Sequence, residues 1–184
     1  DIEKSFKVYE YRDEIALRDF LDKVGIKEQE KIGKEFGLAL KKLHGIKASD
    51  KVDWQKTFLL KSNQIFYKHG LSEIGDDDYM LIDFINANKH LTENTAINLL
   101  YKNISDKNIR IYNENSLDLR GIKKLEYGDG IVDFVEINRM AITNPVFSKA
   151  ALSSYHGDSK PTRKFFRLLS LYQATAILES LINI

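Results

Sequence analysis

The spacing of the apolar residues predicts that the chain is mostly helical. The segment from 28 to 43 has the strongest helical stripe, which consists of Ile32, Phe36, Leu40 and Leu43. These positions fall on one side of a helix of about 3.6 residues per turn, so they are expected to face a core. Gly45 follows them and is expected to end the helix.

The same reasoning predicts six more helices. The run Asp76–Asp78 would open one of them, because carboxylates are favourable at the positive end of a helix dipole. Pro161 suits the first turn of the last helix, where its missing N–H is not needed. The predicted helices are 16–24, 52–69, one that begins after the acidic run, 131–142, one from Pro145 to the residue before Gly157, and one from Pro161 to about 182.

The segment from 99 to 125 departs from helical spacing and predicts a small β-hairpin. An apolar run leads into a polar loop, and a short alternating strand, a polar turn at 113–116 and a second short strand follow. The sequence Phe6–Tyr11 also alternates as a strand does, and Gly128–Gly130 is predicted to be a turn. No repeat or linker divides the chain. The predicted fold class is therefore α+β, mostly α-helical, in one domain spanning 1–184.

The composition argues against some classes of function. The chain has 184 residues, of which 43% are hydrophobic and 30% charged, as is typical of a soluble globular protein. The net charge of +1 gives no reason to expect nucleic acid, and the absence of cysteine fits a reducing compartment. No apolar run approaches the roughly 20 residues that span a bilayer. We therefore expect a cytoplasmic protein without a membrane partner.

Several short motifs occur in an order that points to a known family. Gly37–His44 reads as G-x-x-L-x-x-L-H, and Gly128–Phe134 reads as G-D-G-x-x-D-F. Pro145–Lys149 and Tyr155 follow. Together these segments resemble the C-terminal lobe of the aminoglycoside and macrolide phosphotransferases, which have a protein-kinase-like fold, and the resemblance covers essentially the whole chain. Gly130 replaces a proline of the family motif.

The resemblance implies a domain organisation. Tyr9, Glu10 and Tyr11 would belong to the hinge-like strand, within 1–11, that follows the family's N-terminal lobe. The chain would then be a single kinase-like C-lobe without its N-lobe. Asp1 in place of methionine suggests a fragment or a trimmed chain, and the abundance of Lys, Ile and Asn suggests a bacterial source.

The residues that carry catalysis in the family are changed here. The family's catalytic loop reads H-G-D-x-x-x-x-N, whereas this chain has Tyr101–Asn103 followed by Asn108 at the matching distance. Asn103 stands at the position of the catalytic Asp, and Asn108 matches the metal-binding Asn. Lys124 stands at the position of the Asp that binds the metal in the family's I-D-F strand.

These changes argue against phosphoryl transfer. A neutral amide is not a general base, and an ammonium group cannot be a ligand of Mg²⁺, which requires oxygen donors. The family's phosphate-covering glycine loop and nucleotide-binding lysine belong to the N-lobe. We therefore expect a non-catalytic pseudokinase that needs no cofactor. The vestigial Asn103 and Asn108 have an alternative role as caps of a loop.

One further motif matches the first three residues of the family's catalytic loop. His156–Asp158 reads H-G-D, but Arg163 occupies the position of the metal-binding Asn, and a long helix follows where a strand is required. A surface turn before the last helix is the alternative interpretation, and we adopt it.

Two groups of charged residues have both a functional and a structural interpretation. A basic group could hold an anion or could be a solvated face; it comprises Lys102, Lys107, Arg110, Arg120, Lys123 and Lys124. An acidic group could bind a cationic ligand or a basic protein surface, or could also be solvated; it comprises Glu126, Asp129, Asp133 and Glu136.

The function predicted from the sequence is binding without catalysis. The partner would be a protein, a second copy of the chain meeting the surface that an N-lobe would cover, or a cationic small molecule. One alternative is a phosphotransferase that uses Mg²⁺ and ATP or GTP on a hydroxyl of an aminoglycoside-like compound and needs an N-lobe. A second alternative is metal-independent binding of an anion or nucleic acid by the basic group.

Overall fold

A computed structural model describes most of the chain. The described residues are 13–48, 52–72, 78–102, 104–113, 116–119, 126–157 and 159–182. The predicted strand at 6–11, with Tyr9, Glu10 and Tyr11, lies outside these ranges, as do Asn103 and Lys124.

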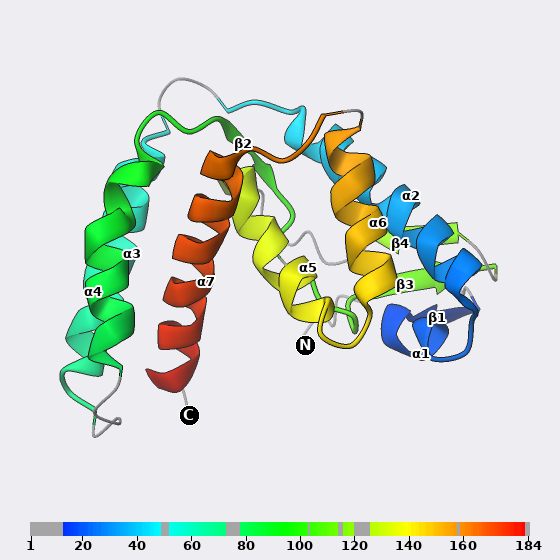
Figure 1. The fold of residues 1–184 in the computed structure, drawn as a ribbon, viewed down its shortest axis with the longest axis horizontal. Helices are drawn as coiled ribbons and strands as arrows, with labels where there is room; N and C mark the ends of the chain where they lie inside the picture. The colour runs from blue at the N-terminus through cyan, green and yellow to red at the C-terminus, as the bar shows by residue number, and fades with distance from the viewer. Residues whose placement is uncertain are drawn as a thin grey trace, which may run out of the picture.

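Helices dominate the fold (Figure 1). The α-helices are α1 (Leu17–Leu21), α2 (Ile26–His44), α3 (Trp54–His69), α4 (Tyr79–Asn88), α5 (Phe134–Met140), α6 (Pro145–His156) and α7 (Arg163–Ile182). Two short 3₁₀ helices are η1 (Lys89–Thr92) and η2 (Gly130–Asp133). The mostly helical α+β class is thus confirmed.

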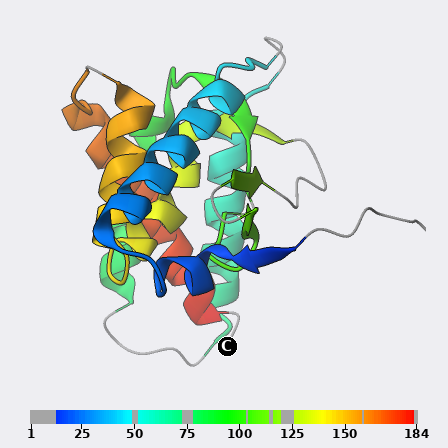
Figure 2. The ribbon, with the colours of Figure 1, turned by 90° about the vertical axis from the view of Figure 1, so that its right-hand side faces the viewer.

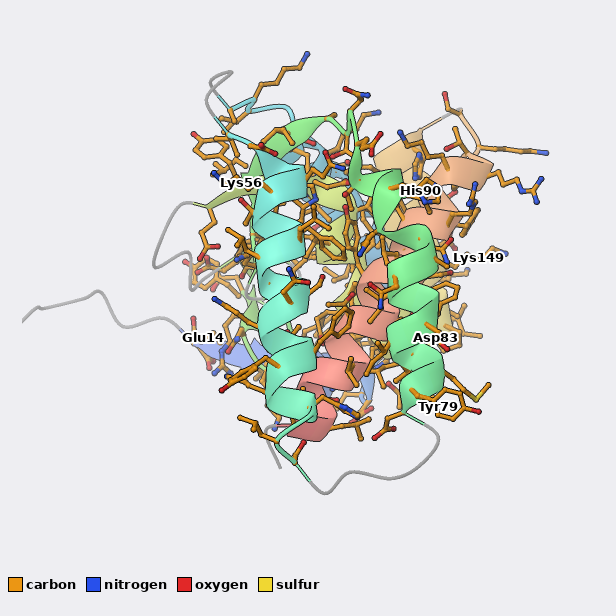
Figure 3. All side chains as sticks on the ribbon, turned by 90° about the vertical axis from the view of Figure 1, so that its left-hand side faces the viewer. Glu14, Lys56, Tyr79, Asp83, His90 and Lys149 are labelled. Atoms are coloured by element: carbon orange, nitrogen blue, oxygen red, sulfur yellow. The ribbon has the colours of Figure 1, made fainter. Side chains whose placement is uncertain are left out.

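The helices form two groups. In Figure 1, α3, α4 and α7 stand at one end of the molecule, α2 and α6 at the other, and α5 between them. Figure 3 shows that α3 and α4 run antiparallel, with Tyr79 at the end of the pair where α3 finishes and with α7 visible between them. The buried residues form two apolar clusters, to both of which α7 contributes, and the partly buried Ile131 and Val135 contact both clusters. The segment 130–140 therefore joins the two halves.

Glycines allow α2 and α6 to pack closely, as they lie in Figure 2. A Cβ atom on Gly37 would lie 2.2 Å from the carbonyl oxygen of Ala151, and one on Gly33 would lie 2.5 Å from that of Phe147. Real Cβ atoms do not approach backbone oxygens this closely. Glycine is therefore required at both positions by the partner helix, rather than by backbone conformation.

Two small sheets complete the fold. The strands are β1 (Glu14–Ala16), β2 (Ile97–Leu100), β3 (Ile109–Tyr112), β4 (Ser116–Leu119) and β5 (Glu126–Asp129). One sheet has the antiparallel order β1-β3-β4, and the other pairs β2 with β5 so that Leu99 faces Tyr127. The amide of Leu99 also donates to the carbonyl of Ile46, which follows α2. The predicted hairpin is confirmed as β3–β4, although β4 begins at Ser116, within the predicted turn.

Some predicted elements need correction. Gly128 and Asp129 belong to β5 rather than to a turn, because their backbone pairs with β2. The predicted helix at 131–142 consists of η2 and the shorter α5. The predicted 16–24 helix ends at Leu21, and the last helix begins at Arg163, two residues after Pro161.

Helix α7 bears on the expectation that no apolar segment is long enough to span a bilayer. By length and composition alone, it is apolar enough to cross one. It carries a buried face, which includes Leu168, Leu171, Tyr172 and Leu178 and packs with residues of α3 and α4. A helix at the centre of a folded domain has the same apolar composition.

Candidate functional site

The buried carboxylate of Asp133 organises the region that the sequence singled out. Its Oδ2 accepts hydrogen bonds from the backbone N–H of Tyr101 at 2.7 Å and pairs with His44 Nε2 at 3.1 Å. Its Oδ1 accepts from the backbone N–H of Lys102 at 2.9 Å. Asp133 is 3% exposed and ends η2. One side chain thus fixes the start of the loop that follows β2.

His44 extends this arrangement to α6. Its Nδ1 lies 2.9 Å from the hydroxyl of Tyr155, and a Cβ atom on Gly130 would meet the imidazole ring at 2.7 Å. Burial, followed by the negative charges of Asp129 and Asp133, raises the pKa of Tyr155 to about 12. The Tyr155 hydroxyl therefore keeps its proton at neutral pH and remains a hydrogen-bonding group.

The loop after β2 has an unusual backbone at Lys102. Its φ is +56°, a left-handed conformation that favours glycine, and the resembled family has glycine at this place in its loop. The Lys102 ammonium pairs with Glu126 of β5. Farther along the loop, the Arg18 Nε donates to Asp106 Oδ2 at 2.7 Å, which connects the loop to α1. Several independent contacts therefore hold the loop 101–108.

A cavity of about 330 Å³ opens beside this loop, and we name it the first cavity. Aromatic residues of α3 and α7 line it, namely Trp54, Phe58 and Tyr172. Lys102, Asp133 and Glu136 line the side nearest the loop. A cavity with apolar walls and a few converging polar groups is the usual form of a small-molecule site, and its volume lies near the lower end of that range.

A second hydrogen-bonded chain runs behind the first cavity. Trp54 Nε1 donates to the Tyr172 hydroxyl at 2.9 Å, and that hydroxyl donates to Asp129 Oδ2 at 2.8 Å. Asp129 Oδ1 accepts from the backbone N–H of Ile131 at 2.9 Å. Burial raises the pKa of the Asp129 carboxyl, and burial first and then the nearby Asp129 charge raise the pKa of Tyr172. This chain links α3, α7 and β5.

The acidic group predicted from the sequence does not form one surface patch. Asp129 and Asp133 are 4% and 3% exposed, and the hydrogen bonds described above occupy their carboxylates. Glu126 pairs with Lys102, and Glu136 pairs with Arg139 at 2.6 Å. The two aspartates are buried rather than on a surface patch, because charge pattern alone cannot show that a carboxylate is enclosed and bonded to backbone N–H groups.

The basic group is also divided. Lys102 is paired, Lys107 is exposed, and Arg110 of β3 lies opposite Asp118 of β4. The remaining members, Arg120, Lys123 and Lys124, lie outside the described residues. The described part therefore shows individual cations rather than a continuous basic surface.

Asn108 lies where the loop meets β3. Its backbone N–H donates to the Ser105 hydroxyl and to the Ser105 carbonyl, both at 3.1 Å, and so closes a turn. This geometry agrees with a structural role for the turn and leaves open the role of the Asn108 side chain. Asn103 lies outside the described residues.

The H-G-D sequence at 156–158 lies at the end of α6, outside the loop after β2. His156 ends α6, where it contacts Phe134, Tyr155 and Phe165. Burial, followed by the charge of Lys41, lowers the pKa of His156. The surroundings are aromatic, and Asp158 lies outside the described residues.

The residues that the resemblance assigns to the metal site do not fit Mg²⁺. In that assignment, Lys124 would offer a cation where the metal needs an oxygen donor, and Asn103 would offer a neutral amide in place of a carboxylate. Among the described residues, no three His, Asp or Glu side chains gather as a metal site would require. We therefore derive no step through a metal at this site.

Sequence reasoning missed several residues of this region. His44 and Tyr155 were named only as parts of the resembling motifs, and Trp54 and Tyr172 were not assigned to the site. Their partners lie more than 40 residues away along the chain. The only signal in the sequence was that some of these residues lie close to motif residues along the chain. That proximity does not identify their hydrogen-bond partners.

Among the comparisons with known proteins, only the search of solved structures finds matches, and these have a similar fold. No protein-family model matches the chain, and no curated protein matches it. The solved structure of the gentamicin–APH(2″)-IIa complex matches with a TM-score of 0.60 at 16% identity, covering 95% of this chain and 58% of that chain. The structure of the streptomycin–ATP–APH(2″)-IIa ternary complex matches with a TM-score of 0.56 at 16% identity, covering 82% and 55%.

These matches establish architecture over most of the chain. At 16% identity they show the fold alone, and the chain spans little more than half the length of either solved structure. This chain therefore has the fold of a lobe-sized part of an aminoglycoside phosphotransferase.

Proposed function

We propose that this chain is a binding domain with a phosphotransferase-like fold that performs no phosphoryl transfer. The observation that carries the proposal is the contrast between the supported loop after β2 and the residues at the two positions that the resemblance assigns to catalysis and metal binding. Asp133 holds the backbone of Tyr101 and Lys102 in place, whereas the two positions that would supply carboxylates contain Asn103 and Lys124. A loop that keeps its support without its acid–base and metal-binding groups suits binding better than catalysis.

The first cavity is the binding site in this proposal. Its aromatic walls would bury the apolar part of a ligand, and Glu136 and Glu179 would attract amino groups at its rim. Lys61 pairs with Glu179 at 2.7 Å, so a cationic ligand would have to replace this ion pair. A protein side chain that carries an amine could make the same contacts.

Two measurements test the proposal. The natural chain is incubated with Mg²⁺, radiolabelled ATP or GTP, and gentamicin or streptomycin as acceptor, and no labelled acceptor is expected. Thermal unfolding is then followed with gentamicin alone, because a ligand that binds only the folded state raises the melting temperature. Phosphorylated acceptor from the natural chain would overturn the proposal.

Matched variants locate the binding. Glu179→Gln should weaken a stabilisation by gentamicin, whereas Glu30→Gln, which removes an exposed carboxylate of α2 far from the cavity, should not. Equal effects of the two variants would mean that the response is non-specific attraction between charges.

The alternative is a phosphotransferase, and the ATP in the name of the similar ternary complex favours testing it. A melting-temperature increase that requires both Mg²⁺ and ATP would support this alternative. The double variant Asn103→Asp, Lys124→Asp supplies both carboxylates and serves as the comparison. A response confined to that variant would support the loss of nucleotide chemistry in the natural chain.

A further inference from the structure

A second cavity is lined by Asp129, which does not line the first cavity. Its volume is about 310 Å³, and in the described part of the chain the two cavities have no lining residue in common. The segment before β2, the end of α6 and the start of α7 surround it. Figure 1 shows the connection between α6 and α7 beside β2.

The second cavity has a buried anionic group at one side. Asp129 is 4% exposed, and two of its acceptor positions are used by Tyr172 and the backbone N–H of Ile131. A carboxylate has about four acceptor positions, so it can accept further hydrogen bonds from a ligand. Burial penalises its ionised form more than the nearby Lys164 favours it, and an ammonium group in the cavity would reduce that penalty.

The mouth of the cavity carries a cation. Lys164 is exposed on α7, lines the second cavity, and is near enough to Asp129 to act on its charge. Among the described residues it makes no ion pair within 4.0 Å. An anionic group of a ligand could therefore meet Lys164 without displacing another carboxylate.

Two further features describe the middle of the cavity. Ile131, Phe165 and Leu168 provide an apolar wall. His156 also lines the cavity, and its Nε2 is buried without a hydrogen-bond partner among the described residues. Buried polar nitrogens normally have partners, so this one is suited to a polar atom of a ligand.

We propose that the second cavity binds a small zwitterion of the α-amino-acid class with an apolar side chain. The ammonium group contacts Asp129, the carboxylate contacts Lys164, and the side chain packs on Phe165 and Leu168. The cavity suits one such molecule, because its volume is at the lower end of the range for ligand sites. The proposal is independent of the first cavity and of phosphoryl transfer.

The test uses the natural chain and L-leucine as the probe. Isothermal titration calorimetry should show saturable binding at one site. Two analogues separate the ends of the molecule, since 4-methylpentanoate lacks the ammonium group and isopentylamine lacks the carboxylate. Each analogue should bind about tenfold more weakly or worse, because each loses one charge-assisted contact. Analogues that bind as tightly as leucine would overturn the proposal.

Variants test whether leucine binds in the second cavity. Asp129→Asn keeps the shape and removes the charge, and Lys164→Gln changes an exposed side chain that folding does not require. Both should weaken leucine binding about tenfold or more. Arg163→Gln is the control, because it removes a charge from the neighbouring position of α7 that does not line the cavity. No saturable heat with leucine, or equal affinity in Lys164→Gln and Arg163→Gln, would contradict the proposal.

Trp54 offers a second readout. It is the only tryptophan in the chain and is connected to Asp129 through the Tyr172 hydroxyl. Leucine bound at Asp129 should therefore change tryptophan emission with the affinity found by calorimetry. Calorimetric binding without any change in emission would place the probe away from Asp129 and would contradict the proposal.

Discussion

His44 and Asp133 are 89 residues apart in the sequence, and His44 Nε2 lies 3.1 Å from Asp133 Oδ2. This contact joins the end of α2 to the segment that links the two halves of the fold. The same carboxylate holds two backbone N–H groups of the loop after β2. The position of that loop therefore depends on one buried side chain.

Replacement of Asp133 should destabilise the protein in a graded way. Asp133→Asn offers a single acceptor oxygen, and a buried N–H left without a partner costs about 1–3 kcal/mol. Asp133→Ala leaves both backbone N–H groups and His44 without this partner, so it should lower the free energy of unfolding more than Asp133→Asn does. Chemical denaturation measures both. Glu136→Gln, on the exposed face of the next helix, should stay within about 0.5 kcal/mol of the natural chain.

The backbone at Lys102 predicts an unusual effect of glycine. Lys102→Ala and Lys102→Gly both remove the ion pair with Glu126, but only glycine adopts a φ of +56° without a steric penalty. The glycine variant should therefore be more stable than the alanine variant by about 1 kcal/mol, although glycine usually destabilises. Equal stabilities in denaturant unfolding would show that the left-handed conformation carries no strain.

The packing of α2 on α6 predicts a large effect of one methyl group. Gly37→Ala places a Cβ atom 2.2 Å from the Ala151 carbonyl, so the helices must separate, and overpacking of this kind costs about 1–3 kcal/mol. Gly25→Ala is the matched control, because a Cβ atom there meets nothing within 4 Å. Thermal unfolding should show a lower melting temperature for Gly37→Ala alone.

The sequence predicted the fold better than the site. Helical spacing located α2, α3 and α7 because each buries one face, and such a face repeats along the chain, whereas Pro145 and Gly157 marked the ends of α6. Alternating residues located β3, but the second strand was predicted after the polar turn, whereas β4 begins at Ser116 within that turn. By contrast, β1 and β5 pair with β3 and β2, which are distant in the sequence, so no adjacent turn indicates their pairing.

The site was harder because its residues act through distant partners. Motif spacing brought attention to Asp133, but nothing in the sequence indicated that it caps backbone N–H groups or contacts His44. Asp129 shows the same difficulty, since a G-D-G tripeptide reads as a turn until β2 is placed beside it. Enclosure by α3 and α7 determines that both carboxylates are buried, and enclosure is a property of the folded chain.

The hydroxyl of Tyr172 should be needed for stability. Tyr172→Phe keeps the ring but leaves Trp54 Nε1 without an acceptor and removes a donor from Asp129. We expect a loss of about 1–3 kcal/mol in the free energy of unfolding. Asp129→Asn should be milder, because its amide can still accept from Ile131 and donate to Tyr172. A double variant that adds the two single effects would mean that the residues do not interact.

The buried Tyr101 and the partly buried Tyr155 predict a loss of stability in alkaline solution. Burial, followed by nearby carboxylates, raises the pKa of both Tyr101 and Tyr155 to about 12, from an ordinary value of about 10. Between these pH values the folded chain keeps protons that the unfolded chain releases. The contribution to stability is therefore complete below pH of about 10 and is lost as the pH rises through about 12.

The variant Tyr155→Phe should reduce the steepness of this alkaline loss, because one of the two groups no longer titrates. Tyr67→Phe, at a position on α3 that is 71% exposed, is the matched control and should leave the steepness unchanged. Denaturant unfolding at a series of pH values from 8 to about 12 measures the slope directly. Parallel curves for the natural chain and Tyr155→Phe would show that this hydroxyl is not responsible, and the alkaline loss would then belong to other groups.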